Sequence, residues 1–105
     1  MSYHANSQER RLLTAGLREL ADFLDQNPLV PAPRRAELLV FPANGSDAEM
    51  FAEVDVIAGQ IGRSASADDS LAGHYSAKRD FGLVQYRAVA IPNWAFANDG
   101  GEAAE

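Results

Sequence analysis

The chain has no cysteine among its 105 residues. This absence excludes disulfide frameworks, zinc fingers, iron–sulfur clusters and thiol nucleophiles. The sequence also lacks any run of about eighteen apolar residues, so it predicts no membrane-spanning segment. The first ten residues lack the apolar core of a signal peptide, and we therefore expect a cytoplasmic protein.

Positive charge is scarce. Nine basic residues stand against fifteen acidic ones, which gives a formal net charge of -6. Such a balance disfavours non-specific binding to nucleic acid or to anionic membranes. The charge is unevenly distributed, because segment 37–69 carries -6 and segment 73–92 carries +2. With 47% apolar and 23% charged residues, the composition is typical of a globular chain.

Residues 7–26 are predicted to form an amphipathic helix. Its apolar stripe recurs at spacings of four, three and four residues and consists of Leu13, Leu17, Leu20 and Leu24. Asn6 and Glu9 have the spacing of a capping box, and Asn27-Pro28 predicts the end of the helix. We expect this helix to be part of the core, with its charged side in solvent.

A strand, a second helix and a hairpin are predicted after the proline-rich connector 29–33. The strand covers 37–41, and the helix begins with a capping box at Ser46 and ends at Gly62, a left-handed cap. The hairpin strands cover 74–80 and 83–91, with a turn near Phe81-Gly82. Residues 63–72 are predicted to be a polar loop.

These elements predict an α+β fold in the order α-β-α-β-β. We expect a three-stranded, mainly antiparallel sheet with both helices on one face and the last strand between the other two. A sheet with the hairpin added outside the first strand is the alternative. Residues 1–6 are expected to be flexible, 7–97 to form a single domain, and 98–105 to be a disordered acidic tail.

The hairpin is the segment with a pattern that suggests binding. Alternation sends the apolar residues of both strands to one face and leaves a hydrogen-bonding, partly cationic set on the other. That set, with the aromatic residue that follows the hairpin, gives our candidate binding residues: His74, Ser76, Lys78, Gln85, Arg87 and Trp94. Trp94 either covers the edge of the core or anchors a second chain.

Three function classes remain. The favoured hypothesis is a non-enzymatic module that binds an unidentified protein through the hairpin face or a sheet edge, where a second copy is another candidate partner. The first alternative is a nucleic-acid-associated regulator that uses the same partly cationic face of the hairpin. The second is a small enzyme around His74 with Asp68 or Asp69. No cofactor and no metal is predicted, because one imidazole beside loop carboxylates is a weak signal.

Two stretches resemble a known group of sequences. Gly73-His-Tyr75, Phe81-Gly82 and 86–92 look like a pattern in short uncharacterised proteins of actinobacteria and their phages or integrated elements. The stretch 20–28 followed by 30–33 is similar too. The resemblance implies a bacterial or phage cytoplasmic setting and supplies no catalytic residues.

Overall fold

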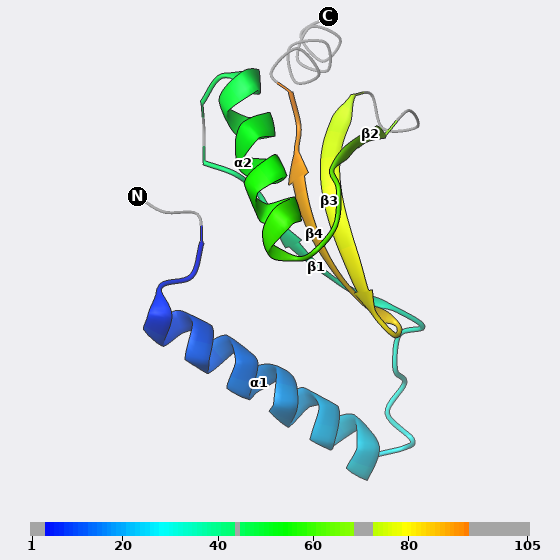
Figure 1. Ribbon diagram of the computed structural model, residues 1–105. Coiled ribbons are helices and arrows are strands. Elements are labelled where there is room, and N and C mark those ends of the chain that lie inside the picture. Colours follow the sequence, from blue (N-terminus) through cyan, green and yellow to red (C-terminus); the bar gives the residue numbers. More distant parts are fainter. Residues whose placement is uncertain (1–3, 44, 69–72, 93–105) are drawn as a thin grey trace, which may run out of the picture. The chain divides into compact units, whose positions relative to one another are not determined.

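The structure is a computed structural model that describes residues 4–43, 45–68 and 73–92 (Figure 1). The chain divides into two compact units, residues 1–34 and 35–105. The described part of the first unit contains one helix, and that of the second contains a helix and a sheet. Trp94 and the acidic tail lie outside the described residues.

Helix α1 forms the first unit and spans Ser7–Gln26, as the sequence predicts. Its capping box is present: the Glu9 amide donates to Asn6 Oδ1 over 2.8 Å, and the Asn6 amide donates to Glu9 Oε1 over 2.9 Å. Within its own unit, no residue of α1 is buried. That its leucine stripe is part of the core stays a prediction, because periodicity identifies an apolar face but not what covers it.

The second unit contains a four-stranded mixed sheet with the order β1-β4-β3-β2. The strands are β1 (Ala36–Val40), β2 (Ser66–Asp68), β3 (His74–Phe81) and β4 (Val84–Ala90). The last strand lies between the first strand and its hairpin partner, which confirms that prediction. The predicted number of three strands is wrong, because β2 adds a fourth strand. The sheet is mixed: two of its three pairings are antiparallel, as predicted, and β1 pairs with β4 in parallel.

The short strand β2 explains this difference. It lies in the segment predicted to be a polar loop and pairs antiparallel with β3. Since β3 is antiparallel to β4 and β4 is parallel to β1, β2 runs in the same direction as β1. The chain therefore crosses from one edge strand to the other through the second helix, and only then turns into the hairpin.

Helix α2, Asp47–Gln60, packs on one face of this sheet (Figure 1). The core joins three helix residues to two alanines of the hairpin: Met50, Val54, Ala58, Ala77 and Ala90. Small side chains on the strands allow the helix to approach closely, and Val54 is fully buried between the two layers. Within the described residues, neither helix is long and apolar enough to cross a membrane.

Candidate functional site

The strand register assigns each hairpin residue to one face of the sheet. Residues directly opposite each other in an antiparallel pair share a face, so Ala77 and Ala88 define the face that packs against α2. Lys78 and Arg87 are the next opposed pair and therefore lie on the other face. We call this other side the polar face; it carries Glu37, Leu39, Ser76, Lys78, Asp80, Gln85 and Arg87, and buried Val89 opposite Ser76. The alternation of the hairpin is confirmed, but Val89 places one apolar residue on the polar face.

Pairing across three strands arranges the polar face in rows. One row is acidic and consists of Glu37, Gln85 and Asp80. Gln85 is buried in this row and donates a hydrogen bond from Nε2 to Asp80 Oδ1 over 2.8 Å. The neighbouring row is basic and runs from Leu39 through Arg87 to Lys78. One acidic band and one basic band therefore lie next to each other along the strands.

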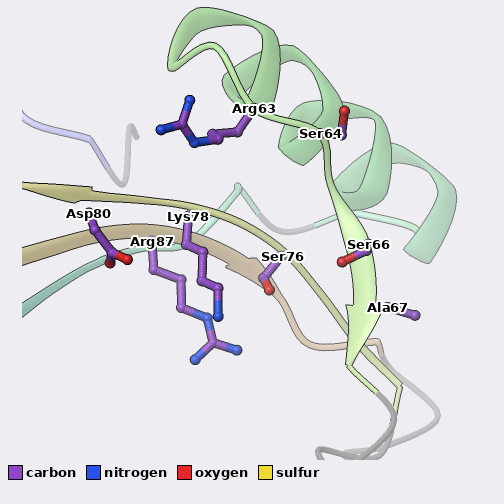
Figure 2. A pocket seen from close by; sticks show the side chains of 8 residues that line it. All are labelled: Arg63, Ser64, Ser66, Ala67, Ser76, Lys78, Asp80 and Arg87. Carbon is purple, nitrogen blue, oxygen red and sulfur yellow. The ribbon is translucent and has the colours of Figure 1, made fainter.

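A polar hollow of about 600 Å³ lies beside the basic row. Its lining comes from the end of α2, from β2 and from the hairpin: Arg63, Ser64, Ser66, Ala67, Ser76, Lys78, Asp80 and Arg87. Figure 2 shows Lys78 and Arg87 extending from adjacent strands to the same side of the sheet, away from α2. Three cationic side chains against one carboxylate give this lining a local charge of +2, in a chain whose net charge is -6.

The end of α2 positions Arg63 at this hollow. Gly62 has a φ of 69°, a left-handed conformation that glycine adopts without strain. The Arg63 amide donates to the Ala58 carbonyl over 2.8 Å and the Gly62 amide to the Gly59 carbonyl over 3.2 Å, which together form a Schellman motif. The Arg63 side chain also donates from Nη1 to the Gly62 carbonyl over 2.9 Å. The predicted cap at Gly62 is confirmed.

The face against α2 holds an aromatic stack and a cation–π contact. The Tyr75 ring stacks on Phe51 with 4.7 Å between centroids. Its hydroxyl donates to Asp55 Oδ1 over 2.6 Å, and this hydrogen bond is the main reason that the pKa of Tyr75 is raised. Arg79 lies 5.1 Å from the centre of the Phe81 ring and donates to the Ile61 carbonyl over 3.3 Å. Arg79 therefore has its contacts on the helix side of the sheet.

The structure brings together three of the six predicted binding residues, namely Ser76, Lys78 and Arg87. Gln85 lies on the same face but is buried and bound to Asp80. His74 begins β3 and is not part of the lining of the hollow.

Sequence reasoning missed the contribution of Arg63, Ser64 and Ser66 to the hollow. They lie in the segment expected to be a loop, and only the Gly62 cap could have indicated where Arg63 would be held.

The small-enzyme alternative places His74 with Asp68 or Asp69. His74 and Asp68 are opposite each other in the β2–β3 pairing. Among the residues described, no group of three or more histidine, aspartate or glutamate side chains is arranged to hold a metal ion. Asp69 lies outside the described residues.

Comparison with protein-family models, with curated proteins and with solved structures gives no match to this chain, so its function must be argued from its own residues.

Proposed function

We propose that this protein is a non-enzymatic binding module that recognises an acidic segment of a protein partner through the polar face. One observation carries the proposal: Lys78 and Arg87 are direct cross-strand neighbours beside a polar hollow, within a strongly acidic chain. The resemblance noted above adds the setting, an accessory protein of a phage or integrated element that acts in the bacterial cytoplasm.

Two cationic side chains directly opposite each other can bind one carboxylate of a partner together. Arg87 can bind a carboxylate through two parallel hydrogen bonds, and Lys78 adds a point charge beside it. The hydroxyls of Ser66 and Ser76 in the lining supply further donors.

A protein is favoured over nucleic acid because of two features. The net charge of -6 opposes approach to a polyanion, whose binding depends on many basic contacts. Sheet proteins that bind single-stranded nucleic acid stack bases on outward aromatic side chains. In this hairpin, Tyr75 stacks on Phe51 of α2, and Tyr86 is paired with Arg79 on that same side. A short acidic peptide requires only the few cations present.

The acidic row supports binding to an extended segment with alternating character. Glu37 and Asp80 lie one step along the strands from the basic row. A partner with carboxylates over Lys78 and Arg87 and a basic or amide side chain over the acidic row would match both bands. Exposed Leu39 at the β1 end of the basic row offers an apolar contact for the same segment.

Selection from a displayed library of random dodecapeptides tests the proposal. We expect the wild-type protein to enrich acidic peptides, and the best of them to lose at least about tenfold in affinity for Lys78→Glu/Arg87→Glu. The matched control is Arg34→Glu/Arg35→Glu, which makes the same charge change at two exposed connector residues. Both variants should keep the wild-type melting temperature within a few degrees.

Three outcomes would contradict the proposal. The first is enrichment without acidic residues, and the second is equal loss of binding in both variants. The third is saturable, salt-sensitive binding to a DNA or RNA oligonucleotide that Lys78→Glu/Arg87→Glu removes, which would favour the nucleic-acid alternative.

A further inference from the structure

Strand β3 is longer than the strand that pairs with its outer side. All of His74–Phe81 faces β4 on one side, whereas β2 pairs on the other side only as far as Ser76. Figure 1 shows β2 beside the first part of β3 alone. Within the described residues, 77–81 therefore have no neighbouring strand on this side, which we call the free edge.

The hydrogen bonds of the sheet show which backbone groups point to the free edge. Consecutive residues of a strand direct their N–H and C=O to opposite sides. The Ala36 amide of β1 donates to the Leu83 carbonyl over 3.0 Å, so odd-numbered residues next to and in β4 face β1 and even-numbered ones face β3. Even-numbered residues of β4 are opposite odd-numbered residues of β3. Lys78 and Asp80 therefore direct their backbone N–H and C=O to the free edge.

The free edge is open and lies at the polar hollow. Residues 78–81 are all exposed, and the described residues give the backbone of Lys78 and Asp80 no hydrogen bond on this side. Ser64 and Ser66, which come just before and at the start of β2, line the hollow together with Lys78 and Asp80. The hollow is thus the space beside β3 that β2 leaves empty. Such an edge binds an extended peptide as an additional strand.

We propose that the acidic segment of the partner binds along the free edge as an additional strand, antiparallel to β3 and in line with β2. This inference rests on the proposed function and specifies how the segment is held. Backbone hydrogen bonds to Lys78 and Asp80 supply affinity, and the side chains of alternate residues supply specificity. Antiparallel pairing is favoured because it is slightly more stable per residue than parallel pairing.

The register predicts the order of residues in the bound segment. Side chains opposite Lys78 and Asp80 share the polar face with them, so an acidic residue fits the first position and a basic residue the second. Arg87 lines the same hollow and adds a second cation for the acidic residue. The residue between them lies on the helix side, where the Phe81 ring is 58% exposed, and should be apolar. From N- to C-terminus, the expected motif is Lys or Arg, an apolar residue, and Asp or Glu.

A second copy of this chain fits the free edge less well than a peptide. Because β3 carries a basic and an acidic residue two positions apart, a two-fold pair in which Lys78 is opposite Asp80 of the other copy matches the charges. The same register brings Gly82 of that copy opposite Ser76, where β2 is already paired. A hairpin turn therefore meets β2 in this arrangement, whereas a short segment ends before it.

Amide hydrogen exchange of the full chain, followed by NMR, tests the binding mode. In the free protein, the amides of Lys78 and Asp80 should exchange fast, and those of Arg79 and Phe81, which face β4, should exchange slowly. A saturating amount of the best selected acidic dodecapeptide should slow Lys78 and Asp80 at least about tenfold. Arg79 and Phe81 are the matched internal control and should change little.

Two results of this experiment would overturn the proposal. Slow exchange of Lys78 and Asp80 in the free protein would mean that the chain itself or a second copy covers the free edge, and analytical ultracentrifugation would distinguish the two. Unchanged exchange at saturation would exclude an added strand, although the peptide still binds to the polar face. If the selection enriches no acidic peptide, the proposed function fails and this inference fails with it.

Methylation of the peptide backbone separates strand pairing from side-chain recognition. Each N-methyl group removes one amide donor and keeps every side chain. Methylation at every second position of the motif should lower the affinity at least about tenfold, and at the positions between them much less, because only alternate amides of an added strand face β3. Exchange of the acidic and basic residues keeps the composition and should lower the affinity at least about tenfold.

The contradicting result is distinct from failure of the proposed function. Equal affinity of all N-methylated peptides, together with the loss of binding in Lys78→Glu/Arg87→Glu, would show that side chains alone hold the peptide. The added strand would then be excluded, and recognition of an acidic segment by the polar face would remain.

Discussion

The two helices of this protein begin with the same capping box and then differ in how far their own units bury them. In α1, Asn6 and Glu9 exchange hydrogen bonds, and no residue of the helix is buried. In α2, Ser46 and Glu49 make the same exchange over 2.9 and 3.1 Å, and four residues of the helix are buried. Start signals and periodicity therefore predict that a helix forms, whereas its role depends on a surface elsewhere that fits it.

The side chains of each stripe account for part of this difference. Helix α2 presents Met50, Val54 and Ala58 to a sheet surface built from Ala77 and Ala90, so short side chains meet short side chains. Helix α1 instead presents longer side chains, leucines at spacings of four, three and four residues. Its seven charged residues also keep the remaining surface polar.

The largest expected effect on stability comes from a carboxylate placed in the apolar stripe of α2, compared with the same change in the stripe of α1. Val54→Asp buries a carboxylate at a fully enclosed position and should destabilise unit 35–105 by more than about 4 kcal/mol. Leu17→Asp makes the same kind of change in α1 and should leave the unfolding of that unit unchanged. Urea denaturation followed by Trp94 fluorescence and by NMR of β3 amides measures both. Equal destabilisation by the two variants would remove the distinction between the helices.

A smaller effect is expected from the contact that ties β3 to α2. Tyr75→Phe keeps the ring stacked on Phe51 and removes the hydrogen bond to Asp55, which should cost at most about 1 kcal/mol. The pKa of Tyr75 is raised above 10.0 in the folded state, so the contribution of this bond is present below pH 10.0 and is lost as pH rises through the folded-state pKa. Spectrophotometric titration should find one of the three tyrosines ionising late, and this step should vanish in Tyr75→Phe.

The two capping boxes provide a matched pair of substitutions. Ser46→Ala should destabilise unit 35–105 by about 1 kcal/mol, because α2 is part of its core. Asn6→Ala should lower the helicity of α1 without changing the melting temperature of that unit. Circular dichroism and thermal denaturation separate the two effects. A lower melting temperature for Asn6→Ala, equal to that for Ser46→Ala, would contradict the comparison.

The smallest effect is expected on the N-terminal cap of α2 when the pH is lowered. Hydrogen bonds to the Ser46 backbone and hydroxyl lower the pKa of Glu49 below its ordinary value of 4.5. Its contribution to the α2 cap is therefore complete above pH 4.5 and is lost as pH falls through the lowered pKa. Amide hydrogen exchange at the first turn of α2 should accelerate in that range in the wild type. Glu49→Gln, which keeps an acceptor but cannot titrate, should remove the pH dependence.

Much of the fold follows from local signals. The bounds of α1, the cap of α2 at Gly62 and the hairpin are set by capping residues, proline and glycine, which act within a few residues. The central place of β4 was also predicted. The strand β2 was not, because three residues of Ser-Ala-Asp have no strand pattern of their own and form a strand only by pairing with β3. The direction of β1 relative to the hairpin was missed as well, because the additional strand β2 reverses the chain before the hairpin begins.

The site is predictable to a similar extent. Alternation in β3 and β4 correctly places Lys78 and Arg87 on one face, because the side-chain period of a strand is fixed at two. It cannot predict that Lys78 is directly opposite Arg87, since the register depends on the length of the turn at Gly82. Nor can it predict that β2 and the end of α2 bring serines and Arg63 to the same hollow.

The central claim is that one face of the sheet is used for packing and the other for binding. Titration of ¹⁵N-labelled protein with the best selected acidic peptide tests it most directly. We expect chemical-shift changes concentrated at Arg63, Ser76, Lys78 and Arg87, with the amides of α2 residues 50–58 little affected. Changes concentrated on α2, or spread evenly over both units, would contradict it.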